Sequence, residues 1–262
     1  MFNDILKSIY FCLKRGVFMS KINLWNEYKK ISAECEFIDL SHEVSPETPH
    51  WSGFPSMRAE KKFDYSDGFL VHEFSLVSQY GTHVDAPCHF VEGKRELDKI
   101  TADELILPLC VIDFREKTAE NPDYAFTKKD ITDWEEKYGK IPENAFVAAC
   151  TSWYKRKDMD NYDSEGNKHY PGWSIDALKF LVEERHIHAI GHETADTDAS
   201  ADSAKHGYIC ETYILSQNRY QIELMKNLEL VPPTGSLIFC GFPKIKNGSG
   251  FTARCIAVCP KE

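Results

Sequence analysis

The sequence has no excess of positive charge and no long hydrophobic run. Its 262 residues include 31 lysines and arginines against 41 aspartates and glutamates, which gives a formal net charge of −10. A chain of this charge with no basic stretch is a poor partner for nucleic acid or for an anionic membrane surface. No apolar stretch approaches the roughly 20 residues that a membrane-spanning helix needs. The composition therefore favours a small-molecule substrate or a cation as the partner.

Paired cysteines are lacking as well. The nine cysteines are odd in number and scattered, and no C-x-x-C pair occurs among them. Several, such as Cys110, Cys150 and Cys240, lie inside apolar runs, where a free thiol behaves as a small hydrophobic side chain. This pattern predicts reduced cysteines and a cytoplasmic protein.

Hydrophobic residues make up 42% of the chain and charged residues 27%, which is typical of a globular protein. From Phe37 onward, short apolar runs alternate with helical patterns without an internal repeat or low-complexity linker. We therefore expect one α/β domain over residues 36–262, after an N-terminal extension over residues 1–35 that is partly helical. Because Met19 opens a second candidate start, residues 1–18 are an upstream extension, a short amphipathic helix or a misassigned start.

Eight segments have the apolar and β-branched character of strands. They span Phe37–Ser41, Phe69–Ser78, Leu109–Phe114, Ala145–Thr151, His188–Gly191, Arg219–Leu224, Ser236–Phe242 and Thr252–Val258. A covering helix is expected at Lys128–Tyr138, because Thr127 and Asp130 form a capping-box pattern and Gly139 follows as a stop.

Two further helices and one loop are predicted. Ser174 caps a helix from Ile175 to Arg185 that carries apolar residues on one face. A weaker helical pattern spans Ala204–Gln217. The polar, turn-rich run Lys155–Tyr170 is predicted to be an exposed loop.

The densest group of reactive side chains lies in Gln79–Phe90, which reads Q-Y-G-T-H-V-D-A-P-C-H-F. His83 and Asp85 are two residues apart, so an extended chain directs both side chains to the same face. Gln79 can join them if Gly81 bends the chain. Nitrogen and oxygen ligands at a strand end are what a divalent hydrolytic metal needs. The alternative is that the histidines are hydrogen-bonded loop residues and that Asp85 forms a turn before Pro87.

The segment resembles the metal-dependent cyclase hydrolases, a family that includes bacterial kynurenine formamidase and isatin hydrolase. Their motif is close to H-x-G-T-H-x-D-x-P-x-H-F. Similar matches follow along the chain: D-L-S-H at Asp39–His42, T-P-H-W-S-G at Thr48–Gly53, C-T-S-W at Cys150–Trp153, G-H-E-T-A-D-T-D at Gly191–Asp198 in place of the family's G-x-D-T-x-S-x-D, I-E-L-M-K-N-L-E-L at Ile222–Leu230 and G-F-P-K-I-K-N-G-S-G-F-T-A-R at Gly241–Arg254. Several motifs in the same order make the resemblance specific.

The resemblance implies a swivelling β/β/α fold with a mixed sheet and covering helices, assembled as a homodimer or homotetramer. It also implies one or two divalent ions per subunit, Mn²⁺ or Zn²⁺ with Mg²⁺ as a further candidate, and hydrolysis of amide-like C–N bonds. The residues carried over are Gln79, His83, Asp85 and Glu223 for a first ion, Asp85, Glu211 and Glu223 for a second, His89 as the catalytic histidine and Trp51 as a substrate contact.

Two positions depart from the family pattern, because Gln79 and Glu211 stand where the well-known members have histidines. The ligand set becomes rich in oxygen, with His83 as its one nitrogen ligand. Such a set favours Mn²⁺ or Mg²⁺ more than a histidine-rich site would.

The predicted reaction is hydrolysis of a small amide, lactam or N-formyl compound, such as an aryl formamide. The ion would activate water, and His89 would transfer a proton to the leaving nitrogen. Aromatic residues near the motifs, namely Trp51, Phe54, Phe90 and Trp153, would suit a flat aryl substrate. His192, Glu193, Asp196 and Asp198 are dense enough to form a second site, but such polar loops commonly support ligands by hydrogen bonds, which is the role expected here.

Two other functions fit the same residues. Cys88 could act as a nucleophile beside His89, although adjacent residues of an extended chain point to opposite sides. The fold could also be a metal- or ligand-binding module without catalysis, since two of the expected ligands are altered.

Overall fold

The computed structural model describes residues 22–261. The chain divides into two compact units, Met1–Cys35 and Glu36–Glu262. The described part of the first unit is mainly helix α2 (Leu24–Glu34), whose first turn is capped by the Asn23 side chain. The candidate upstream segment, residues 1–18, lies outside the described residues. Among the described helices, none has the length and apolar character needed to cross a membrane.

The second unit is built on a nine-stranded mixed sheet with the strand order β1-β13-β11-β5-β7-β9-β10-β4-β12. In that order the strands span Cys35–Asp39, Arg254–Pro260, Ser236–Gly241, Ile106–Asp113, Phe146–Cys150, Ala189–His192, Tyr220–Glu223, His83–Asp85 and Gly250–Thr252. The central strands β5, β7, β9 and β10 run parallel, and the flanking pairs are antiparallel. The fold is therefore the predicted α/β domain with a mixed sheet.

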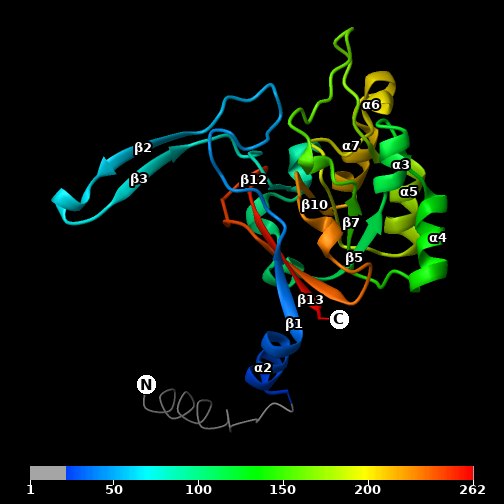
Figure 1. Cartoon of the computed structure of the whole chain (residues 1–262), viewed down its shortest axis with the longest axis horizontal. Coiled ribbons are helices and arrows are strands. Elements are labelled where there is room, and N and C mark those ends of the chain that lie inside the picture. Colours follow the sequence, from blue (N-terminus) through cyan, green and yellow to red (C-terminus); the bar gives the residue numbers. More distant parts are fainter. Residues whose placement is uncertain (1–21, 262) are drawn as a thin grey trace, which may run out of the picture. The chain divides into compact units, whose positions relative to one another are not determined.

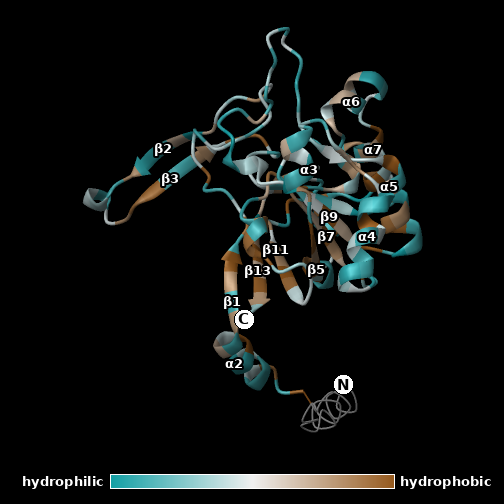
Figure 2. Cartoon of the chain, turned by 45° about the vertical axis from the view of Figure 1, so that its right-hand side comes forward, coloured by the Kyte–Doolittle hydropathy of each residue, from teal (hydrophilic) through white to brown (hydrophobic). Residues whose placement is uncertain are grey.

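Helices cover one face of the central strands, as Figure 1 shows. They are α3 (Arg115–Glu120), α4 (Lys128–Tyr138), α5 (Ile175–Lys179), α6 (Ser200–His206) and α7 (Ile209–Ser216). The short strands β6 (Ala125–Phe126) and β8 (Gly172–Trp173) pair beside them. In Figure 2 much of the α4 ribbon is hydrophilic, whereas hydrophobic colour marks strands of the sheet.

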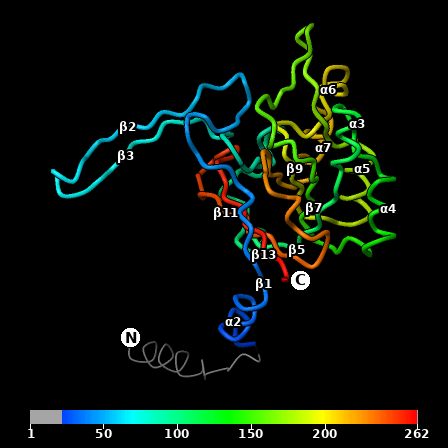
Figure 3. Tube along the Cα trace, viewed as in Figure 1, coloured from blue at the N-terminus to red at the C-terminus, as the bar shows by residue number. Residues whose placement is uncertain are grey.

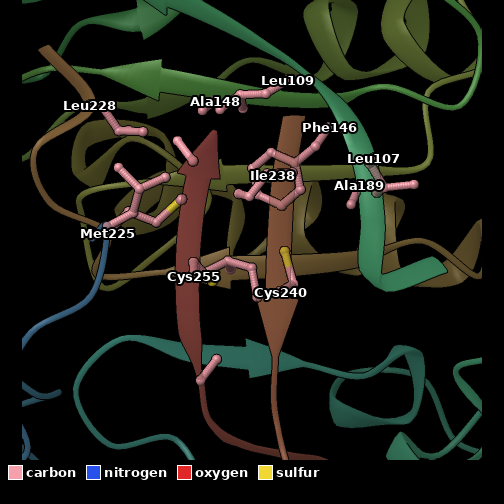
Figure 4. Packing of buried hydrophobic residues seen from close by; sticks show 14 of the residues in the cluster. Leu107, Leu109, Phe146, Ala148, Ala189, Met225, Leu228, Ile238, Cys240 and Cys255 are labelled. Carbon is pink, nitrogen blue, oxygen red and sulfur yellow. The ribbon is translucent and has the colours of Figure 1, made fainter. Parts of the chain in front are cut away.

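Strand alternation divides the interior into two cores. Along β7, Phe146 and Ala148 face one core, whereas Val147 and Ala149 face the other together with residues of α4, α5 and α7. The first core lies inside the curled sheet, where side chains of β11 and β13 gather with those of β5, β7 and β9 (Figure 4). Both faces of the central strands are thus buried, which explains their continuous apolar runs.

Most predicted elements are present, and α4 has the predicted bounds. The predicted helix Ile175–Arg185 forms α5 and continues as a π-helical turn over Phe180–Glu184. The single helix predicted over Ala204–Gln217 is wrong, because Gly207 adopts a positive φ of 71° between α6 and α7. The strand predicted over Thr252–Val258 is present as β13, which begins at Arg254, whereas Thr252 belongs to the separate strand β12, which pairs with β4.

A two-stranded ribbon extends from the sheet, as the trace in Figure 3 shows. It consists of β2 (Arg58–Phe63) and β3 (Val71–Ser75), which pair only with each other, and all their residues are exposed. The strand predicted over Phe69–Ser78 is longer than β3, which spans only Val71–Ser75. The sequence did not indicate β2, because R-A-E-K-K-F lacks the apolar alternation of a half-buried strand.

Candidate metal centre and active site

The centre of the site is β4, which lies between β10 and β12. Val84 points into the core and is fully buried, so His83 and Asp85 on either side of it face the site. The His83 Nδ1–H donates to the Gly81 carbonyl oxygen at 2.8 Å, which turns Nε2 toward the carboxylates. That nitrogen lies 3.6 Å from Asp85 Oδ2 and 3.5 Å from Glu223 Oε2.

Strand β10 and helix α7 bring two more carboxylates to β4. The antiparallel register sets Glu223 opposite His83 and Gln221 opposite Asp85. Glu211 lies in the first turn of α7. Its backbone N–H and that of Cys210 both donate to the Asp198 carboxylate, at 3.1 and 2.8 Å, which fixes the start of this helix against the site.

Gln221 was missed by the sequence reasoning, although it touches every carboxylate of the centre. Its Nε2 lies 3.0–3.1 Å from oxygens of Asp85, Glu211 and Glu223, so the two amide hydrogens are shared among three acceptors, and its Oε1 accepts from Thr197 at 2.7 Å. The sequence could have indicated Gln221, because it lies two residues before Glu223 in a predicted strand, and residues two apart in a strand point to the same face.

The residues of this centre fit a divalent cation. Two groups have ligand atoms within 4.8 Å of one another, namely His83, Asp85 and Glu223, and Asp85, His89 and Glu211. Asp85 Oδ1 is buried without accepting a hydrogen bond from any described residue. Carboxylate and imidazole ligands with an unsatisfied carboxylate oxygen are the chemistry that a divalent ion completes.

The pKa values reflect this concentration of negative charge. Burial, followed by repulsion from neighbouring carboxylates, raises the pKa of Glu211 and of Glu223 well above the usual range. Burial alone would lower the pKa of His83, but the carboxylates of Asp85 and Glu223 raise it to about 9. Burial alone would raise the pKa of Asp85, but His83 and His89 lower it to about 2. The centre thus needs positive charge, which either protons or a metal ion can supply.

His89 lies at the edge of the centre, at the end of the 3-10 helix Pro87–His89. Its side chain is 26% exposed, against 5% for His83, and its Nε2 lies 3.7 Å from Asp85 Oδ1. The amide of Gln79 approaches His89 Nδ1 at 3.4 Å and Ser249 Oγ at 3.3 Å. His89 thus lies close to the carboxylates while remaining open to the cavity.

Gln79 is held in a tight place beside β12. A Cβ atom on Gly250 would lie 2.6 Å from the Gln79 amide nitrogen and 2.3 Å from the Val84 carbonyl oxygen. The glycine therefore allows β12 to approach β4 and leaves room for Gln79.

A cavity of about 230 Å³ opens onto the centre. Its walls combine predicted site residues with aromatic and acidic side chains: Trp51, Phe54, Gln79, His83, His89, Phe90, Ala195, Asp196, Tyr208, Glu211 and Glu223. The Trp51 and Phe54 rings meet edge to face at 4.9 Å, as do those of Phe90 and Tyr208 at 5.7 Å. Trp153 does not line this cavity, since it is buried and donates to the Met159 carbonyl oxygen.

Residues of the polar run His192–Asp198 have different positions: some contact the candidate ligands or the cavity, and others make hydrogen bonds outside it. The buried His192 donates to Glu223 at 3.3 Å, and burial lowers its pKa to about 4. Glu193 instead accepts three hydrogen bonds from Thr151 and Trp153, at 2.7–3.0 Å. Asp196 lines the cavity, which the sequence reasoning missed, as it also missed Tyr208.

Comparison with known proteins places this architecture in a family. The family model described as "Putative cyclase" matches residues 38–199, and the chain belongs to that family. Isatin hydrolase of Roseibium aggregatum is 29% identical over 252 residues, which cover 89% of this chain and 95% of the relative.

Solved structures agree with this assignment. Isatin hydrolase A from Labrenzia aggregata, bound to benzyl benzoate, is 31% identical and has a TM-score of 0.85, with 91% of this chain and all of that chain covered. An isatin hydrolase bound to the product analogue thioisatinate is 28% identical with a TM-score of 0.83, and 90% and 96% of the two chains are covered.

Proposed function

We propose that this protein is a metal-dependent hydrolase that opens the C–N bond of a small lactam or related amide, and that isatin is the first substrate to test. The observation that carries this proposal is the buried group of His83, Asp85 and Glu223, because His83 and Glu223 also line the cavity together with aromatic side chains. Similarity to isatin hydrolases over most of the chain supports the lactam. Aryl formamides are a second substrate type for the same chemistry.

His83, Asp85 and Glu223 would hold the first ion, with Gln79 beside them. Glu211 would help to hold a second ion together with Asp85. A bound divalent ion supplies Lewis acidity, which polarises a carbonyl group and lowers the pKa of water toward about 7. Gln221 and His192 orient the carboxylates through the hydrogen bonds that they donate.

His89 is the proposed proton-transfer residue. Its imidazole lines the cavity and lies beside the buried carboxylate of Asp85, so it can accept a proton from water and deliver it to the leaving nitrogen. Trp51, Phe54 and Phe90 would pack on a flat ring and exclude bulk water from the reacting bond.

Metal analysis and a substrate panel test the proposal together. The metal content of protein purified without added ions is measured by mass spectrometry, and hydrolysis of isatin, cyclic imides and N-formyl anilides is followed by absorbance. Metal with turnover supports the hydrolase. Metal without turnover identifies a binding module, and turnover that survives metal removal contradicts the proposal.

A Cys88→Ala variant is the control for thiol chemistry. Cys88 is not among the cavity-lining residues, and burial followed by repulsion from Glu96 raises the pKa of its thiol. The variant should therefore keep most of the activity. A loss of about four orders of magnitude in kcat would instead identify a nucleophilic thiol.

The oxygen-rich ligand set leads us to expect a preference for Mn²⁺ or Mg²⁺ over Zn²⁺. Replacing Gln79 with histidine adds a nitrogen ligand, so Gln79→His should shift the activity preference toward Zn²⁺. Activity is measured after reconstitution with each metal. An unchanged metal profile would count against Gln79 as a ligand.

Further properties remain proposals. The exposed apolar side chains of the β2–β3 ribbon support a homodimer or homotetramer, because an isolated two-stranded ribbon is marginally stable in water. Seven of the described cysteines are free thiols, which supports a reducing compartment such as the cytoplasm; they are Cys35, Cys88, Cys110, Cys150, Cys210, Cys240 and Cys255.

A further inference from the structure

Asp196 places a carboxyl group in the wall of the substrate cavity. It belongs to neither group of candidate metal ligands, but its charge is near enough to contribute to the raised pKa values of Glu211 and Glu223. Its side chain is largely buried, with 9% of the residue exposed. A charged side chain at such a position is costly unless hydrogen bonds or nearby charges compensate it. Its partners therefore indicate what the carboxyl group is arranged to bind.

One oxygen of the Asp196 carboxyl group already accepts a hydrogen bond within the protein. The Tyr170 hydroxyl donates a hydrogen bond to Asp196 Oδ2. No described residue donates to Oδ1, and this oxygen is not among the buried atoms that lack a partner. Oδ1 is therefore not fully buried, and because Asp196 lines the cavity, this oxygen can accept a hydrogen bond from a molecule bound there.

At neutral pH Asp196 is still mostly a carboxylate, although its surroundings raise its pKa. Burial raises the pKa of Asp196 to about 6, with Tyr170 and Lys168 opposing that rise. Repulsion from the Asp196 carboxylate is the main reason that the pKa of Tyr208 is raised. Since Tyr208 also lines the cavity, Asp196 and Tyr208 form one polar region of its wall.

We propose that Asp196 is a substrate-binding residue that selects lactams and amides carrying a hydrogen-bond donor, an N–H or O–H group, for this part of the cavity. The inference rests on the proposed hydrolase function and adds the substrate class. The cavity of about 230 Å³ is small, so a two-ring substrate that reaches the metal ligands also reaches this wall. A substrate without a donor would leave the carboxylate desolvated and unpaired.

Serine and asparagine are suitable replacements for Asp196, because each keeps a polar side chain and removes the negative charge. A serine hydroxyl is neutral and can both donate and accept, whereas a carboxylate can only accept.

The test compares isatin with N-methylisatin, which lacks the N–H group, for the metal-loaded wild type, Asp196→Ser and Asp196→Asn. If Tyr170 donates to the asparagine carbonyl oxygen, the amide nitrogen faces the cavity as a donor in place of an acceptor. The ratio of kcat/KM for the two substrates should fall about ten- to a hundredfold in both variants, which is the worth of a hydrogen bond to a charged group. Asp196→Asn keeps the size of the side chain, so a change of the ratio in that variant does not come from extra room for the methyl group.

Asp202→Ser is the matched control, because it removes a carboxylate from α6 without altering a cavity-lining residue. Its ratio should equal that of the wild type. An unchanged ratio in both Asp196 variants, with isatin still hydrolysed, overturns this inference and leaves the proposed function intact.

Binding measurements separate the two proposals if the wild type hydrolyses neither compound. Calorimetric titration then gives the ratio of the two dissociation constants for each variant. A ratio that falls in both Asp196 variants supports the donor-binding role without catalysis. If both Asp196 variants have the same ratio of dissociation constants as the wild type, or if neither compound binds, the donor-binding role of Asp196 is overturned.

Discussion

His83 and Glu223 face each other across β4 and β10, and their separate tasks can be tested residue by residue. His83 is almost fully buried against carboxylates, whereas His89 reaches the cavity. This difference in burial supports a ligand role for His83 and a proton-transfer role for His89.

The two histidines should therefore differ when each is changed to alanine. His83→Ala should lower both metal content and turnover. His89→Ala should retain the ion at the His83 group and lower kcat by about 10²–10⁴, with a smaller change in KM. Metal content and kinetics are measured on both purified variants. If His89→Ala loses metal as well, His89 is a ligand, in keeping with its grouping with Asp85 and Glu211.

Gln221 provides a second test at this scale, because its amide hydrogens are shared among three buried carboxyl groups. Gln221→Met keeps the size of the side chain and removes the donors. The metal-free variant should lose about 2–3 kcal/mol of unfolding free energy, since buried carboxyl oxygens lose their hydrogen-bond donor.

Bound metal should restore part of that loss, because the ion also neutralises the carboxylates. Thermal unfolding with chelator and with Mn²⁺ measures the stabilisation by metal, which should be larger in Gln221→Met than in the wild type. Equal stabilisation would show that the amide does not compensate the charge of the centre. Gln217→Met, an exposed position at the end of α7, is the control.

At the scale of elements, Glu104 makes hydrogen bonds that connect the segment after the metal motif with His188, the residue before β9. Its carboxylate accepts hydrogen bonds from Arg95 and Thr101 at 2.8–2.9 Å and from His188 at 2.6 Å. Burial alone would raise the pKa of Glu104, but the hydrogen bonds from Arg95 and Thr101 lower it to about 2. The ionised carboxylate thus stabilises the folded state.

This lowered pKa predicts a pH dependence. The stabilisation by Glu104 is complete above its unfolded-state pKa of about 4.5 and is lost as the pH falls toward about 2. Glu104→Gln should lower the unfolding free energy by on the order of 3 kcal/mol at pH 7 and by less at pH 3.5. Urea denaturation at both pH values measures the difference. Glu116→Gln on the exposed side of α3 is the control, and a pH-independent difference for Glu104→Gln would contradict the assignment.

At the scale of the whole molecule, the β2–β3 ribbon is one of the described segments whose apolar side chains are left exposed in the single chain. Five apolar side chains of this hairpin, Phe63, Phe69, Leu70, Val71 and Phe74, are 39–60% exposed. Exposed apolar side chains grouped in this way are typical of an interaction surface. We expect a second copy of the chain to cover them.

Light scattering coupled to size-exclusion chromatography should therefore give a multiple of the 30.1 kDa chain mass, corresponding to a dimer or tetramer. The double substitution Phe63→Ser and Phe74→Ser should shift the population toward the monomer, because it removes apolar area from the contact. Lys61→Ser on the same ribbon should not. A monomeric wild type at micromolar concentration would exclude this role for the ribbon.

The sequence by itself determined the local features. Helix α4 has the predicted bounds because its caps lie within a few residues of it, and the two-residue period of β4 and β10 determines which side chains share a face. His83, Asp85 and Glu223 could therefore be named in advance as neighbours with the help of the family motifs.

Only the tertiary structure decided which distant groups meet. The register of β10 brings Gln221 to three carboxylates, the break at Gly207 lets Asp198 hold the start of α7 with Glu211, and the loop after β9 turns Asp196 into the cavity. The same packing buries Trp153 elsewhere, although its motif lies among the others. These outcomes depend on contacts between residues far apart in the chain, which local pattern and residue type do not encode.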